Sequence, residues 1–190
     1  MVARSARMAV LTAVSLVVVG SVAGCGGSGD PANQKVPVST TVPVDEFAAR
    51  NQTPQPGAVG IGLTRITLAH TNTADQVTFE FTGNAVPGWS VHYVNQPVQN
   101  GTRTPFTVTG QSVIEVLIRE AANPFTSGAA PYSGPPTVTD PSTTTVGEVR
   151  YASQLRGVTQ AFIGLQTPQR KFRLTGLTNP TRVVLEVDHR

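Results

Sequence analysis

The sequence predicts an all-β protein, an antiparallel β-sandwich of about eight strands, and three observations support this fold class. Val (27) and Thr (25) make up more than a quarter of the 190 residues, and β-branched side chains favour strands over helices. Gly and Pro together number 33, which provides many turns. Hydrophobic and polar residues alternate in short segments along most of the chain after residue 60. A single modest β domain fits these features.

The alternation defines the strands in order. In the segment 77–81, Val77, Phe79 and Phe81 share one face and polar residues the other. The predicted strands are 65–70, 77–81, 89–93, 114–118, 146–152, 161–165, 172–174 and 183–187. Turn sequences such as Asn100-Gly101 and Asn179-Pro180 separate them. Because strands with one buried face pack as two layers, a sandwich is favoured, and a closed β-barrel is the alternative.

The first 24 residues are typical of an export signal. Arg4 and Arg7 precede an apolar run over residues 8–19, and small residues follow. The run is shorter than the roughly 20 residues that a membrane-spanning helix needs. We therefore expect residues 1–24 to be a lipoprotein signal peptide.

The cleavage site contains the single cysteine of the chain. Val22-Ala23-Gly24-Cys25 matches a bacterial lipobox, in which the cysteine is diacylated and becomes the new N-terminus. Two acyl chains hold a protein at a bilayer more firmly than one. We therefore predict lipidation of Cys25, and localisation at the outer face of the cell membrane.

The remaining chain divides into a spacer and a domain. Residues 25–57 are rich in Gly, Pro and Thr and are expected to form a flexible tether, with Asp45–Arg50 as a weak helical turn. Residues 58–190 are expected to form the β domain. It contains a Pro/Gly-rich loop over 123–145, either functional or disordered, for which a tolerated surface insertion is the favoured interpretation.

The charge of the mature chain argues against nucleic acid as a partner. Without Arg4 and Arg7, the 14 basic side chains fall to 12 against 11 acidic ones, a net charge of +1. A nearly neutral surface gains little from counterion release. We therefore expect no nucleic-acid binding.

Catalytic and metal-binding patterns are weak. The sequence has no Gly-x-Ser-x-Gly elbow and no phosphate-binding glycine loop. His70 and His189 have Asp75 and Asp188 nearby, while His92 stands apart, and two ligands do not make a zinc site. We therefore expect each histidine to be an exposed or rim residue, and we expect no metal and no cofactor.

Paired carboxylates are the remaining enzymatic option. Glu80, Glu115 and Glu186 each lie on the polar face of a predicted strand. Within glycosidase distance of one another they could act as acid and base. The simpler interpretation is a solvated face with Arg119 or Arg182 as cross-strand partners, so we expect no catalytic residues.

A ligand surface is the better candidate for function. Aromatic rings stack on sugars and arginines pair with carboxylates. The candidate ligand-binding residues are Trp89, Tyr93, Arg119, Arg150 and Arg182. The alternative for the two aromatic residues is ordinary packing in the core, and for the arginines exposure to solvent.

Three segments carry a resemblance to a known family. They are VTFEFTG at 77–83, VPGWSVHYV at 86–94 and FRLTGLTNPTRVVLEVDH at 172–189. The stretch from Gln76 to His189 resembles the AMIN-like domain of actinobacterial lipoproteins. Arg182 and Asp188 match the closing pattern of the broader AMIN domain, and Glu186 stands where that strand often has its aspartate.

The resemblance implies a fold and a role. The AMIN domain is a non-catalytic β-sandwich that targets cell-wall amidases and secretins to peptidoglycan. By this resemblance we expect a non-enzymatic binding module that contacts peptidoglycan or another cell-wall glycan. The alternatives are a protein-interaction scaffold of the cell envelope and, more remotely, a carboxylate-pair hydrolase.

Overall fold

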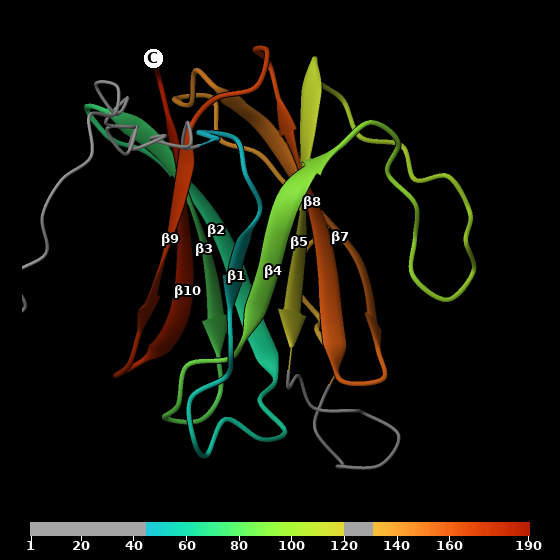
Figure 1. Ribbon diagram of the computed structural model, residues 1–190, viewed down its shortest axis with the longest axis vertical. Helices are drawn as coiled ribbons and strands as arrows, with labels where there is room; N and C mark the ends of the chain where they lie inside the picture. Colours follow the sequence, from blue (N-terminus) through green and yellow to red (C-terminus); the bar gives the residue numbers. More distant parts are fainter. Residues whose placement is uncertain (1–44, 120–130) are drawn as a thin grey trace, which may run out of the picture. The chain divides into compact units, whose positions relative to one another are not determined.

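Two antiparallel sheets face each other in the computed structural model, which describes residues 45–119 and 131–190 (Figure 1). The predicted sandwich is therefore confirmed. Neither sheet closes on itself, so the alternative of a closed barrel is wrong. Within the described residues there is no helix long and apolar enough to cross a membrane. The signal peptide, Cys25 and residues 26–44 lie outside the described part of the chain.

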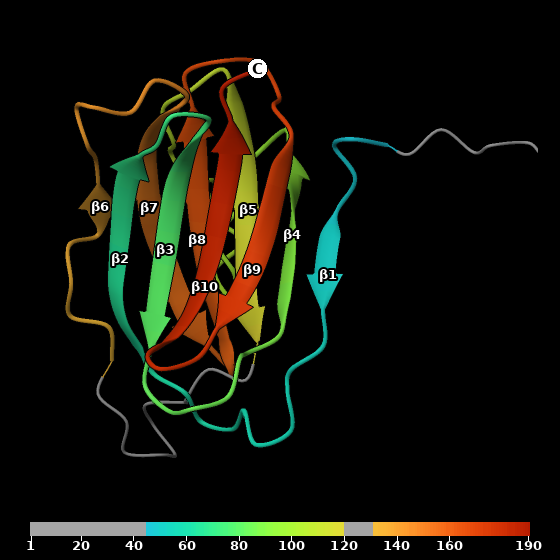
Figure 2. The same cartoon turned by 90° about the vertical axis from the view of Figure 1, so that its left-hand side faces the viewer.

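The larger sheet has six strands in the order β1-β4-β5-β8-β7-β6. Its strands are β1 (Arg50–Gln52), β4 (Trp89–Val94), β5 (Ser112–Arg119), β8 (Val158–Leu165), β7 (Val146–Leu155) and β6 (Thr137–Val138). The smaller sheet has the order β2-β3-β10-β9, with β2 (Leu63–His70), β3 (Ala74–Phe81), β10 (Thr181–Asp188) and β9 (Phe172–Leu177). Figure 2 shows the smaller sheet in front of the larger one.

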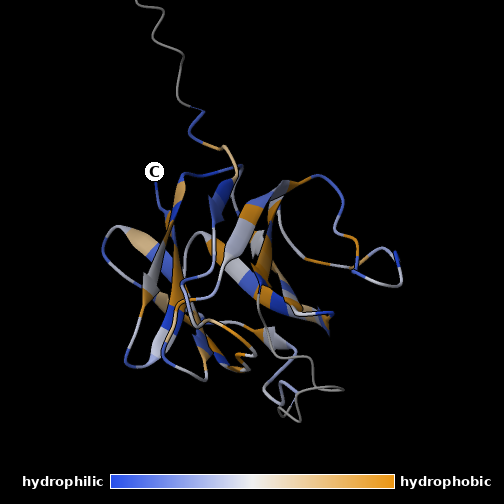
Figure 3. Cartoon of the chain, turned by 60° about the horizontal axis from the view of Figure 1, so that its bottom comes forward, coloured by the Kyte–Doolittle hydropathy of each residue, from blue (hydrophilic) through white to orange (hydrophobic). Residues whose placement is uncertain are grey.

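The core lies between the two sheets and is built by the alternation seen in the sequence (Figure 3). On β3, Val77 and Phe79 are fully buried, and on β5 every second residue from Ile114 to Ile118 is fully buried. Burial of such side chains is the main stabilising contribution to a fold of this size. The eight predicted strands all form, with small changes at their ends. The two additional strands, β1 and β6, are too short to show a period in the sequence.

Strand β8 is buried on both faces, which the alternation did not predict. The loop after β4 covers the outer face of the larger sheet: Phe106 packs on Phe162 with ring centroids 5.4 Å apart, and Gln160 donates a hydrogen bond of 2.9 Å to the carbonyl oxygen of Val98. A Cβ atom at Gly164 would overlap the carbonyl oxygen of Thr109, so a glycine is needed where the loop meets the strand. The loop therefore covers β8 on the side of the larger sheet that faces away from the core.

The segment that enters the sandwich is ordered, contrary to the expectation of a tether up to residue 57. Arg50–Gln52 pairs with β4, and no helical turn extends from Asp45 to Arg50. The Phe47 ring packs edge-on against Tyr93 at 6.3 Å, and the Arg50 guanidinium lies 5.5 Å from the Phe172 ring centroid. The segment thus contacts both sheets, and these ring contacts were not visible in its Pro-rich composition.

The predicted loop over 123–145 is partly structured. Residues 120–130 lie outside the described part of the chain. After them, β6 pairs with β7, and Asp140 accepts hydrogen bonds from the amide and hydroxyl of Ser142 at 2.8 and 2.6 Å. These bonds lower the pKa of Asp140 and form a turn that leads into β7. The second half of the loop is therefore part of the fold rather than a simple surface insertion.

Substitutions in the segment before β2 test whether it belongs to the domain. Ile61 is 3% exposed and Val59 is 79% exposed, although they are two residues apart. We expect Ile61→Ala to lower the free energy of unfolding by about 2–4 kcal/mol because it leaves a cavity. The control Val59→Ala should change it by less than about 0.5 kcal/mol. Urea unfolding followed by circular dichroism measures both, and equal effects would contradict the packing described.

Candidate functional site

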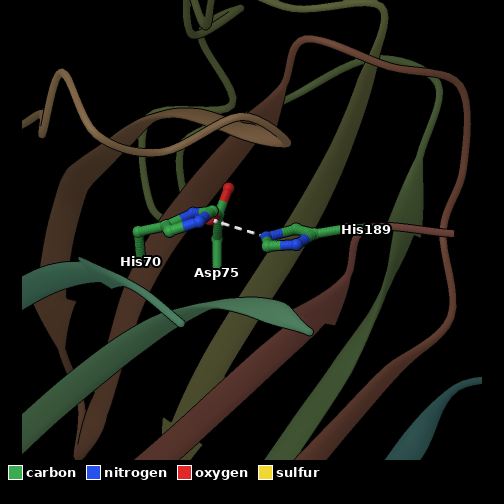
Figure 4. Close-up of side chains that lie close together, drawn as sticks. All are labelled: His70, Asp75 and His189. Carbon is green, nitrogen blue, oxygen red and sulfur yellow. Dashed lines mark hydrogen bonds and ion pairs between the residues drawn. The ribbon is translucent and has the colours of Figure 1, made fainter. Parts of the chain in front are cut away.

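Three titratable side chains meet at one end of the sandwich, where β2, β3 and β10 lie side by side (Figure 4). The Nδ1 atom of His70 lies 2.9 Å from Oδ1 of Asp75, and Nε2 of His189 lies 3.0 Å from the same oxygen. The two imidazole rings are stacked, with centroids 4.7 Å apart and planes 12° apart. We call these three residues the His–Asp–His cluster.

The local fold brings the cluster together. A tight turn joins β2 to β3, in which Thr71 and Ala74 hydrogen-bond to each other, so that His70 stands opposite Asp75 in the ladder. Asp75 is in turn paired with Val187 on β10, and His189 follows two residues later. The amide of His189 donates to the carbonyl of Thr73 at 3.1 Å, which fixes the end of the strand.

Asp75 is a fully buried carboxylate with many donors around it. Its second oxygen, Oδ2, accepts hydrogen bonds from three successive amides, those of Thr144, Thr145 and Val146, at 3.0, 2.7 and 2.9 Å. Burial alone would raise the pKa of this carboxyl. The bonds from the Val146 and Thr145 amides and from the two imidazoles outweigh burial and hold the pKa below its ordinary value. The group is therefore charged in the folded protein.

Sequence reasoning treated these residues as separate pairs, Asp75 with His70 and Asp188 with His189, and the structure joins three of them. The alternation of residues along the strands could have indicated the cluster. Val77 and Phe79 point inward on β3, and a period of two places Asp75 on that same hydrophobic face. The inward residues of β2 and β10 lead in the same way to His70 and His189. A charged residue that continues a hydrophobic face is the pattern that could have revealed the site.

The cluster has the types of ligand atom, two imidazole nitrogens and a carboxylate oxygen, that can bind a metal ion. Among the described residues it is the one group of three or more His, Cys, Asp or Glu side chains whose ligand atoms all lie within 4.8 Å of one another. An adjacent cleft of about 460 Å³ is lined by His189, Asn72, Thr73, Arg173, Asp188 and Arg190. Arg173 is engaged there by Glu186 and Asp188 at 2.8 and 2.6 Å.

A second hollow, of about 430 Å³, lies where β4 ends and β5 begins. We call it the amide hollow, since its lining includes Tyr93, Asn95, Gln111, Ser112 and Gln169. Gln111 and Ser112 donate to the carbonyls of Gln166 and Thr167 at 2.6 and 3.0 Å. Within the described residues, neither the Asn95 nor the Gln169 side chain makes a hydrogen bond. Both amides are available to a ligand.

The two predicted aromatic ligand residues do not form an open groove. Trp89 is 8% exposed and belongs to the core beneath the smaller sheet. The Tyr93 hydroxyl donates to the carbonyl of Arg170 at 2.7 Å and accepts from its amide at 2.8 Å, and the Tyr93 ring packs edge-on against Phe172 at 5.6 Å. Trp89 is therefore packed in the core, which was the alternative to ligand binding. Tyr93 contributes to the core and also to the lining of the amide hollow.

The three predicted arginines lie on different parts of the sandwich. Arg119 is exposed at the end of β5. Arg150 holds the loop over the larger sheet, because it donates to the carbonyl of Thr107 at 2.9 Å and lies 5.1 Å from the Phe106 ring centroid. Arg182 faces outward on the smaller sheet, opposite Glu80. Within the part of the chain that the structure describes, no hydrogen bond, ion pair or ring contact joins any of the three to another or to the two aromatic residues.

The three glutamates considered for hydrolysis do not form a pair. Glu115 lies on the outer face of the larger sheet, where it contacts Gln160 and His92 at 2.6 and 3.2 Å. Glu80 and Glu186 lie on the outer face of the smaller sheet. Their register positions are four residues apart, roughly 13 Å at the rise of a strand. That separation is larger than the ~5–9.5 Å that glycosidases use.

Substitution of Asp75 tests its role in the fold. Asp75→Ala leaves two buried amides and one part-buried amide without an acceptor, and we expect it to lower the free energy of unfolding by about 3 kcal/mol or more. Asp75→Asn keeps one acceptor oxygen and should cost less. Asp140→Asn is the control, because asparagine forms the same exposed turn and should lower the urea midpoint much less than Asp75→Ala does. A stable Asp75→Ala protein would contradict this account.

The comparisons with known proteins agree with the fold and the sequence pattern. The family model of the AMIN-like domain matches residues 61–189, which include every strand from β2 to β10. No curated protein and no solved structure matches the chain. The AMIN-like domain is a binding type of module rather than a known catalytic domain. Because the match covers more than half of the sequence, the chain belongs to the AMIN-like domain family.

Proposed function

We propose that this protein is a lipoprotein at the outer face of the cell membrane whose AMIN-like sandwich binds peptidoglycan or another cell-wall glycan without catalysis. The family match over residues 61–189 is the observation that carries the proposal, since it indicates a module of the cell-wall-binding type. The separation of the three glutamates supports a role in binding rather than hydrolysis.

The anchor rests on the sequence. A basic start, an apolar run too short to span a bilayer and the Val22-Ala23-Gly24-Cys25 site together fit export and lipidation. The described fold makes no use of Cys25, because the sandwich contains no cysteine. Two acyl chains would then keep the domain at the membrane surface, within reach of the cell wall.

The amide hollow is the surface that we assign to the glycan. Glycans present hydroxyl and acetamido groups, which can both donate hydrogen bonds to and accept them from side-chain amides and hydroxyls. Asn95 and Gln169 each supply one side-chain amide to the lining of the hollow. Asn95 lies in the loop after β4, and Gln169 lies in the loop before β9. Tyr93 and Pro97 add apolar surface on which a sugar ring can rest.

A scaffold that binds other envelope proteins is the second candidate, because the edge strand β9 leaves one of its sides unpaired among the described strands. β9 pairs only with β10 among the described strands, and Leu177 on it is 38% exposed. An extended peptide could add to this edge as a further strand. Binding to a protein but not to the cell wall would favour this candidate over the first.

Cys25→Ala tests the anchor. The variant cannot accept a diacylglyceryl group, so we expect loss of the acylated form and accumulation of unprocessed precursor. Each buried methylene contributes about 0.8 kcal/mol to membrane binding, so the acyl chains account for retention. Intact mass spectrometry of the membrane fraction measures this. A mature protein that starts at another residue, or that lacks the mass of the acyl chains, would overturn the assignment.

Removal of the two free amides tests the glycan surface. We expect the double variant Asn95→Ala/Gln169→Ala to bind purified peptidoglycan sacculi roughly 10- to 30-fold more weakly, since each lost hydrogen bond costs about 1 kcal/mol. The matched control is Asn51→Ala/Gln76→Ala, which removes two amides on other surfaces. Equal binding by both variants would place the glycan elsewhere. No enrichment of the parent protein over an unrelated sandwich of equal charge would exclude glycan binding.

A further inference from the structure

We propose that the His–Asp–His cluster is a binding site for a divalent transition-metal ion of the Zn²⁺ type. The ligands would be Nδ1 of His70, Nε2 of His189 and Oδ1 of Asp75, which converge from three neighbouring elements of the smaller sheet (Figure 4). The site is independent of the amide hollow, so it can exist whether or not the protein binds glycan.

The carboxylate is already oriented as a metal ligand would be. Three backbone amides occupy Oδ2 and leave Oδ1 directed at the two imidazoles. Outer contacts of this kind fix ligands in metal sites and are often nearly as important as the ligands themselves. The buried negative charge of Asp75 also favours a cation at this point.

The spacing is close to that of a metal-bound set. Ligands at about 2.0–2.1 Å from a tetrahedral Zn²⁺ stand roughly 3.3 Å from one another. The two nitrogens are 2.9 and 3.0 Å from Oδ1, and the three ligand atoms all lie within 4.8 Å of one another, so the two imidazole rings would turn toward a shared ion. The His70 and His189 side chains are 35% and 19% exposed, which leaves the rings free to move while Asp75 stays fixed.

The metal would take the position that two N–H hydrogens now occupy, and each imidazole would keep its proton on the other ring nitrogen. Each imidazole now places a nitrogen against Oδ1, where an N–H group donates to the carboxylate. On metal binding, His70 would carry its proton on Nε2 and His189 on Nδ1, so that the facing nitrogens become ligands. Neutral imidazoles need only exchange tautomers for this change, and no further reactant is required.

The donor set selects the kind of ion. Two imidazoles and one carboxylate suit Zn²⁺ and its neighbours, whereas Ca²⁺ and Mg²⁺ require mostly oxygen ligands. Three protein ligands leave a position for water or another small ligand. The cleft that His189 lines provides the route of entry.

Calorimetric titration of Zn²⁺ into the full chain tests the proposal. The protein is purified without a histidine tag and with Cys25→Ala, so that its only thiol does not contribute. We expect one equivalent to bind with micromolar or tighter affinity, and His70→Ala and His189→Ala each to weaken binding at least tenfold. The matched control is His92→Ala, which removes a histidine that contacts a different carboxylate, Glu115, at 3.2 Å and should bind as the parent does.

Two further measurements make the result decisive. Co²⁺ bound in place of Zn²⁺ should give the intense visible absorption of a tetrahedral site, and the histidine variants should lose it. Circular dichroism confirms that these variants remain folded. No saturable Zn²⁺ binding, equal affinity in a His70→Ala/His189→Ala double variant, or a preference for Mg²⁺ or Ca²⁺ would overturn the proposal and leave the cluster as a hydrogen-bonded connection.

Discussion

The carboxylate of Asp75 connects the two sheets at one end of the sandwich, and much of the local structure depends on it. Asp75 belongs to β3 of the smaller sheet. The amides that donate hydrogen bonds to it belong to residues just before and at the start of β7, in the larger sheet. A buried charge is tolerated only when donors surround it, and here the turn before β7 provides them. The same residue gathers the two histidines, so the fold and the candidate metal site share one group.

Much of the fold could be predicted because its main physical cause is visible in single segments. Alternating burial on β3 and β5 follows directly from the period of two, and the sandwich follows from half-buried strands. The short strands β1 and β6 could not be predicted, since their pairing depends on partners distant in the sequence. The contact between Phe162 and Phe106 could not be predicted either, because the two residues are distant in the sequence. Strand β8 has no polar face, since a loop rather than water lies over it.

The candidate site could be predicted less well than the fold. Sequence reasoning selected Trp89 and Arg150 because of what such side chains can bind, and the structure uses them to pack the core and to hold a loop. The chemistry of a tryptophan or arginine side chain is the same whether it binds a ligand or packs within the fold, so residue type alone does not distinguish the two roles. Position in the strand period is more informative, because a charged residue such as Asp75 on an inward face must have partners. Asn95 and Gln169 give no local signal, since their proximity arises only when two loops meet.

The order of the entry segment has a mechanical consequence. Tension on the chain before Asp45 reaches the sandwich through β1, which runs antiparallel to β4 and is held by three register pairs. A pull along the strand direction loads these pairs together, in shear, along with the ion pair between Glu46 and Lys171 at 2.6 Å. Only after the β1–β4 pairs and this ion pair have broken does the force reach Ile61 and the core. The small strand at the edge therefore bears the load first, and the sheets behind it can stay closed while the chain is stretched.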